Sequence, residues 1–152
     1  MLGGRPAAAE CSDPGRPEVE WRHCLLDEQD FTGIDLTGAN LRDSSFVRSN
    51  LSRAKLVEIN GYGLKALSTN LSGATLDRAK LESADFTKAD LSGASLKQAD
   101  LRRASLFRAV LKGANLTGAL LRDADLSNAD LTGATWTDGK KICGEGSIGK
   151  CR

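Results

Sequence analysis

Arrangements of residues that could carry catalysis are scarce in this sequence. Its only histidine is His23, and the spacing of the chain places no nucleophile against it. Aspartates recur at regular intervals, where a short acceptor side chain supports a backbone corner; examples are Asp85, Asp90, Asp125 and Asp130. We therefore predict that the protein is not an enzyme.

The glycine-rich tail matches part of a phosphate-binding loop. Residues 144–149 read G-E-G-S-I-G, and Lys150 extends the match toward the Walker A pattern. Such a loop needs a preceding strand and a following helix N-terminus, which converge on phosphate. Here a repeat precedes the loop, and Cys151 stands where a hydroxyl should bind Mg²⁺. We expect no nucleotide or other cofactor.

Composition narrows the range of partners. The 152 residues carry a formal net charge of +1, which favours neither a nucleic-acid binder nor a strongly acidic protein. No run of about 18 apolar residues is present, so no membrane insertion is expected. Only 5% of the residues are aromatic and 16 are glycine, which predicts a narrow core of small and aliphatic side chains.

Between Trp21 and Trp136, every fifth residue is a repeat centre, and 22 of the 24 centres are large and apolar. The exceptions are Gly61 and Ala66. Two residues before the centre, alanine occurs thirteen times in succession from Ala74 to Ala134. Internal repetition therefore determines the architecture.

A period of five fits neither a helical face nor a straight strand. In an α-helix, successive centres lie about 140° apart around the axis, and in a strand alternate centres point to opposite sides. The chain must therefore turn once per repeat. Glycine often follows the centre by two residues, and Asn or Asp often precedes it, as expected at tight corners.

Segments such as 89–93 (A-D-L-S-G) and 129–133 (A-D-L-T-G) resemble those of the pentapeptide-repeat proteins. The resemblance implies an all-β fold, a right-handed quadrilateral β-helix with twenty residues per coil and about six coils. We assign residues 1–18 to a flexible leader, 19–137 to the β-helix and 138–152 to a C-terminal capping loop. The leader is either an ordinary flexible N-terminus or the remnant of a secretory signal.

Sorting the centres in twenties gives four columns. Ala66 falls between Phe46 and Phe86, whose rings we expect to fill the space of a leucine. Gly61 has no such neighbour, so a bulge or distortion of the third coil is predicted. The segment is either a locally repaired coil or a contact site. The residues of this predicted distorted coil are Asn60, Gly61, Tyr62, Gly63 and Lys65.

Both ends of a β-solenoid must be covered. Trp21 and Trp136 are the predicted lids, and Ile142 and Ile148 are expected to cover the C-terminal end. Four cysteines at opposite ends cannot share one zinc ion. We predict disulfides that pair Cys11 with Cys24 and Cys143 with Cys151, which indicates a periplasmic or secreted protein. Four free thiols in a cytoplasmic protein are the alternative.

Two exposed columns stand out when the sequence is folded in twenties. One is an apolar stripe and cations recur in the next, which predicts a flat protein-contact face anchored by Phe107. Scattered surface side chains are the alternative. The face consists of Val47, Arg48, Leu67, Lys88, Phe107 and Arg108. A second cationic group, diluted by acids, consists of Arg42, Arg102, Arg103 and Arg122.

These patterns predict a noncatalytic scaffold that presents rigid faces to a protein partner, as a monomer or weak dimer. The family resemblance implies an alternative, in which the rod mimics DNA and occupies the groove of a type II topoisomerase to protect against quinolones. That mimicry requires a strongly negative rod. A net charge of +1 disfavours it, and no nucleic-acid partner is expected.

Overall fold

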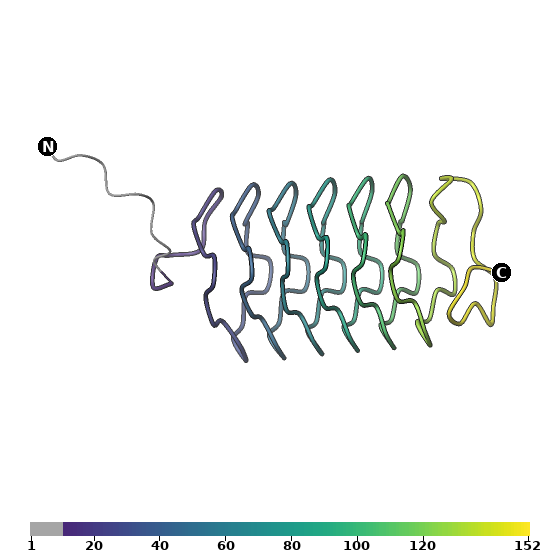
Figure 1. The fold of residues 1–152 in the computed structure, drawn as a ribbon, viewed down its shortest axis with the longest axis horizontal. Coiled ribbons are helices and arrows are strands. Elements are labelled where there is room, and N and C mark those ends of the chain that lie inside the picture. The colour runs from purple at the N-terminus through teal and green to yellow at the C-terminus, as the bar shows by residue number, and fades with distance from the viewer. Residues whose placement is uncertain (1–10) are drawn as a thin grey trace, which may run out of the picture.

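The computed structural model describes residues 11–152. In this range the chain forms no helix and no strand longer than one residue. Single-residue β-bridges recur every fifth residue from Glu20 to Thr135, with a turn between each bridge and the next. Figure 1 shows the result as a row of stacked coils, with the C-terminus at the far end from residues 11–20.

The register of the coils is constant along the rod. Parallel bridges join residues twenty apart, from Glu20 with Asn40 to Asn115 with Thr135. Four five-residue repeats separate each residue from its bridge partner, so each coil has four sides. The predicted twenty-residue, four-sided coil is therefore present.

Backbone hydrogen bonds connect consecutive coils in the same way at each repeat. Around Leu91, the amide of Leu91 donates to the carbonyl of Val110 at 2.7 Å, and that of Gly93 donates to Lys112 at 2.8 Å. The amide of Asp90 donates in the other direction, to Thr69 at 3.0 Å. Each inner coil is thus bonded to the coils on both sides.

The corners explain the polar and glycine pattern. In a typical corner the amide of Ala94 donates to the carbonyl of Leu91 at 3.0 Å, which closes a turn. The Asp90 carboxylate accepts from the Ser92 amide at 2.9 Å, as predicted for the short side chain before a centre. Two residues after the centre φ is positive even where the residue is not glycine, at fifteen positions with φ of 53–62°.

The core follows the predicted inward positions. Leu91, Leu96 and the alanines of the second half are almost completely buried. In the first half, hydroxyl groups enter the core as well: Ser44 and Ser49 are buried two residues before their centres. The interior is narrow, as the composition indicates.

Residues 11–18 are fastened to the first coil, in contrast to the predicted flexible leader. Cys11 forms a disulfide with Cys24, and the Trp21 indole donates to the carbonyl of Asp13 at 3.2 Å. A Cβ on Gly15 would approach Trp21 and Ile34 to 2.9 and 2.3 Å, so this glycine lies directly against the lid. Residues 1–10 of the predicted leader lie outside the described range.

The C-terminal segment turns back on the last coil through antiparallel bridges from Ile142 to Thr135 and from Ile148 to Asp130. The expectation that the two isoleucines cover the core is wrong. Their side chains are 59% and 46% exposed, because the backbone of each makes the bridge. Cys143 is buried in their place.

Candidate functional site

The predicted protein-contact face lies along one corner of the rod. Residues 47–48, 67–68, 87–88 and 107–108 each occupy the two middle positions of a turn. They therefore form a ridge, and the predicted flat wall is wrong. The reason is that the turn follows each centre, so the two residues after it project from a corner. We call this set of turns the corner ridge.

Apolar side chains of the corner ridge are half-buried, and the cations beside them are exposed. The half-buried apolar side chains are those of Val47, Leu67 and Phe107. The Arg108 guanidinium lies 5.2 Å from the centre of the Phe107 ring, a cation–π arrangement that holds both groups in place. Phe107 thus contributes a ring face that is already covered by a cation.

The cations of the corner ridge differ in their ion pairing. Arg48 forms an exposed ion pair with Glu28 at 2.6 Å, so its charge is locally neutralised. Lys88 and Arg108 have no carboxylate within ion-pair distance in residues 11–152. The positive charge of the ridge is therefore concentrated toward its C-terminal part.

The side of the rod that carries Tyr62 contains a polar hollow of about 410 Å³. The Arg42 guanidinium lies 4.4 Å from the centre of the Tyr62 ring, and Arg102 forms ion pairs with Asp100 at 2.6 Å and with Glu82 at 3.6 Å. The hydrogen bond and charge of Arg102 lower the pKa of Asp100. Much of the second predicted cationic group is thus neutralised by neighbouring acids.

The segment around Gly61 keeps the regular backbone ladder, so the predicted bulge is absent from its hydrogen bonding. The amide of Gly61 donates to Lys80 at 2.7 Å, and that of Gly63 donates to Glu82 at 3.1 Å. Tyr62 lines the hollow described above, whereas Lys65 lies beyond the next corner and is not part of its lining. The structure does not bring these two predicted contact residues into one hollow.

Side-chain exchange explains why the ladder survives Gly61. A Cβ on Gly61 would lie 2.8 Å from Leu81 and 3.4 Å from Ile59, so both side chains already occupy the space of a centre. Ile59 is fully buried two residues before the centre, where alanine is usual. Leu64 holds the same position before Ala66. The large residue and the small residue have changed places in both repeats, a signal that the sequence contains but that the centres alone do not reveal.

The hydroxyls of Ser44 and Ser49 have a role that the sequence analysis missed. The Ser49 hydroxyl accepts from the Gln29 amide at 3.1 Å and donates to the Leu26 carbonyl at 2.7 Å. It thereby bridges the two groups that would otherwise close a turn of the first coil. Ser44 bridges Cys24 and Trp21 in the same manner.

Both predicted cysteine pairs are bonded in the structure. Cys11–Cys24 has an S–S distance of 2.03 Å and Cys143–Cys151 one of 2.08 Å. The first anchors residues before the rod, and the second closes the segment beyond it. The two ends are thus crosslinked separately.

The residues that partly match a phosphate loop, and the single histidine, lie in other arrangements. In the tail, Ser147 is buried and its hydroxyl donates to the Gly144 carbonyl at 2.6 Å, and no helix follows. The exposed His23 lies 4.0 Å from a carboxylate oxygen of Asp43. Neither arrangement forms a phosphate cradle or a nucleophile–base pair.

Within residues 11–152, no group of three or more His, Cys, Asp or Glu side chains is placed to hold a metal ion. Over the same residues, no helix has the length and apolarity that crossing a membrane requires.

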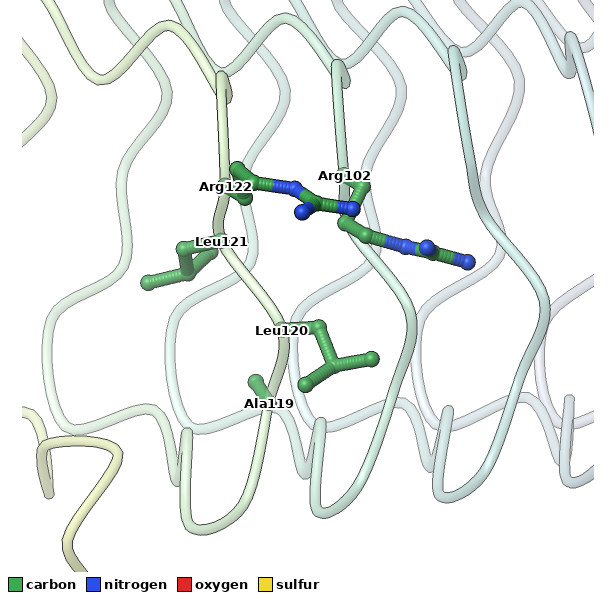
Figure 2. A pocket seen from close by; sticks show the side chains of 5 residues that line it. All are labelled: Arg102, Ala119, Leu120, Leu121 and Arg122. Atoms are coloured by element: carbon green, nitrogen blue, oxygen red, sulfur yellow. The ribbon is translucent and has the colours of Figure 1, made fainter.

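A second hollow of about 410 Å³ lies on the Tyr62 side of the rod at its C-terminal end. Figure 2 shows Arg102 and Arg122 extending in the same direction from consecutive coils, with Leu120 beside them. The Leu121 side chain points the opposite way, away from the coil of Arg102. This end of the rod is therefore more apolar at its surface than the polar hollow near Tyr62.

Comparison with known proteins returned structures with low overall superposition. HetL, a pentapeptide repeat protein involved in heterocyst differentiation regulation in the cyanobacterium Nostoc sp. strain PCC 7120, is 26% identical over 83% of this chain and 79% of its own, with a TM-score of 0.37. A pentapeptide repeat protein of the Arabidopsis thaliana thylakoid lumen is 25% identical over 85% and 84%, with a TM-score of 0.45. QnrB1, a plasmid-mediated fluoroquinolone resistance protein, is 21% identical over 80% and 68%, with a TM-score of 0.31.

A search of curated proteins returned no match to the sequence. The family model for pentapeptide repeats matches in 8 copies, over residues 22–60, 68–103 and 104–135. These ranges cover most of the bridged repeats described above. The chain belongs to the pentapeptide-repeat family.

Proposed function

We propose that this chain, as a right-handed β-helix of about six coils, is a noncatalytic scaffold that binds a protein partner through its corner ridge. The observation that carries the proposal is the ridge itself, in which Lys88 and Arg108 lack ion-pair partners among the described residues and stand beside half-buried apolar side chains. Aromatic and arginine side chains are typical anchors of protein interfaces.

Rigidity supports this role. The residues of the ridge are held by turns that are bonded to the coils on both sides, so the side chains are presented at fixed intervals along the rod. A preordered surface loses little conformational entropy when it binds. A partner with an acidic, partly apolar surface fits the chemistry of Phe107 and Arg108.

The test is crosslinking capture from native extract with the wild type, Phe107→Ala and Arg108→Glu. Lys97→Glu is the matched control, because Lys97 is also exposed at a turn and lies on the opposite corner. We expect both ridge variants to lose a band that the control retains. Capture that is unaffected by either ridge variant would remove the corner ridge as the binding site.

The two disulfides support a periplasmic or secreted location, where an oxidising environment maintains them. Thiol titration of the native protein, with and without reductant, tests this directly. Four reactive thiols before reduction would favour the cytoplasmic alternative. The topoisomerase-binding alternative is tested by a supercoiling assay with purified gyrase, in which potent inhibition would favour that alternative over the scaffold.

A further inference from the structure

The C-terminal segment covers two of the four sides of the last coil. The amide of Leu131 donates to the Ser147 carbonyl at 2.8 Å, and the Trp136 amide donates to Lys141 at 2.7 Å. In the other direction, the Gly149 amide donates to the Ala129 carbonyl at 2.8 Å. On these sides the segment replaces the next coil.

The remaining two sides, residues 119–128, form no backbone hydrogen bond with this segment. The segment comes close only at their end, where a Cβ on Gly149 would lie 3.7 Å from the Asn128 nitrogen. One coil earlier, the amides of Leu101 and Leu106 donate to Leu120 and Asp125 at 2.9 and 2.7 Å. The corresponding groups of the last coil have no backbone partner among residues 11–152. They are the amides of Leu121, Asp123, Leu126 and Asn128 and the carbonyls of Ala119 and Ala124. We call these two sides the open edge.

Core side chains reach the surface at the open edge. Leu121 and Leu126 are partly exposed, whereas Leu101 and Leu106, one coil earlier, are fully buried. Leu120 is 51% exposed, and Figure 2 shows Leu121 directed away from the preceding coil. An unpaired edge with an apolar surface is a template for another strand.

Charges at the open edge define the occupant further. Three arginine–glutamate pairs in this rod join residues twenty apart, and in each the acid is in the earlier coil; these pairs are Glu28 with Arg48, Glu58 with Arg78, and Glu82 with Arg102. Asp123 lies at the same turn position as Glu28 and Glu58. No cation lies within ion-pair distance of Asp123 or Asp125 in the described chain. Hydrogen bonds from Ser127 lower the pKa of Asp125, so its carboxylate is charged near neutral pH.

We propose that the open edge binds an extended segment of another protein by β-strand addition. The segment carries two large apolar residues five positions apart, which cover Leu121 and Leu126, and a Lys or Arg two residues after the first, which meets Asp123. The open edge offers four amide donors and two carbonyl acceptors. The same edge of a second copy supplies too few acceptors for these donors, whereas a free strand presents a carbonyl at each residue.

This inference goes beyond the proposed binding at the corner ridge, and separate experiments can contradict the corner-ridge proposal and the open-edge proposal. The corner ridge variants Phe107→Ala and Arg108→Glu are expected to bind the open-edge probe as the wild type does. Loss of capture at the ridge with normal probe binding would leave the open edge intact, and the converse result would leave the ridge intact.

The probe is a blocked synthetic peptide with the sequence of residues 99–108, A-D-L-R-R-A-S-L-F-R, which has the required spacing of apolar and basic residues. Amide hydrogen exchange of the full chain is followed by NMR as the peptide is added. We expect saturable binding that slows exchange at Leu121, Asp123, Leu126 and Asn128 by about tenfold or more, because these amides gain acceptors. A peptide N-methylated at its second and seventh residues, which face the Ala119 and Ala124 carbonyls, is expected to bind about tenfold more weakly.

Charge reversal tests the predicted register. Asp123→Lys is expected to weaken binding about threefold, the effect of one exposed ion pair, and a peptide with Glu as its fifth residue is expected to restore it. Ser83→Lys is the control, because it adds positive charge at the same turn position two coils away. Thermal unfolding of each variant checks that the rod is intact.

Three results would overturn the proposal. The first is unchanged exchange at the four amides with saturating peptide. The second is full binding of the N-methylated peptide, which would exclude strand pairing. The third is protection of the same amides by raised protein concentration alone, with a dimer in sedimentation, which would identify a second copy as the occupant.

Discussion

The first half of the rod, up to Thr69, and the second half, from Ala74, share one backbone ladder but fill it differently. In the second half, the residue two before each centre is always alanine. In the first half the same position holds Ile59, Leu64 and the buried serines. The ladder therefore fixes the space available per repeat, but side chains can divide this space in more than one way.

The largest change in the free energy of unfolding is expected where the large and small inward side chains have changed places, at residues 59 and 61. Gly61→Leu should cost about 3 kcal/mol, because its side chain would overlap Leu81 and Ile59. Ile59→Ala alone should also cost about 3 kcal/mol through the cavity it leaves. In the double variant the costs should largely cancel, because the repeat then has the pattern of the second half. Urea unfolding measures all three.

The converse exchange is the control in the second half. Ala79→Ile combined with Leu81→Gly should be tolerated better than either change alone. Strictly additive costs in both halves would show that the two inward positions do not share one space.

The next largest effect concerns the two ends. Replacing Cys11 and Cys24 by serine should cost about 3 kcal/mol, and replacing Cys143 and Cys151 slightly less, because the first loop spans 13 residues and the second 8. Thermal unfolding with and without reductant checks this. The wild type should lose stability on reduction, and the variant lacking both bridges should not respond.

Buried hydroxyls should produce a smaller difference between the halves. Ser49→Ala should cost about 1–3 kcal/mol, because the Gln29 amide and the Leu26 carbonyl lose the group that bridges them. Ala109→Ser places a hydroxyl at the same position of the same side in the second half. There the Ala89 amide is already bonded to Phe86 at 2.9 Å, so no stabilisation is expected. Equal and opposite effects in chemical unfolding would contradict this account.

The smallest expected difference is in acid sensitivity. Hydrogen bonding from Thr132 and the charge of Lys112 lower the pKa of Asp130. A carboxylate whose pKa is lower in the folded protein than in the unfolded chain, where it is about 3.9, stabilises the fold above that pH. This stabilisation is lost as the pH falls through the pKa of the folded state. The urea midpoint of the wild type should therefore fall below about pH 4. Asp130→Asn, which mimics Asn50 and Asn70 of the first half, should reduce that fall; an unchanged pH profile would show that this carboxylate does not contribute.

Most of the architecture was predictable from the sequence, since the centres follow from their spacing and the twenty-residue register follows from the resemblance to the pentapeptide-repeat family. The predicted distortion at Gly61 was wrong because only the centres were considered, although Ile59 shows the compensation. The contact face was placed on a wall and lies on a corner, although the glycines two residues after other centres already indicate that the turn falls there. The open edge requires knowledge of where the tail runs, and the glycine-rich sequence of residues 138–152 does not determine that path.

The constant register has a consequence for how such a chain can change in length. Inserting twenty residues at a corner adds one coil and leaves the charges and rings aligned in the same columns along the rod. Inserting only five keeps all centres inward but rotates everything downstream by a quarter turn, so that Arg108 would face a different neighbour. Gene duplications in multiples of twenty residues therefore preserve the surfaces of this rod. Duplications of five residues are equally compatible with folding, but they change which side chains lie side by side on each surface.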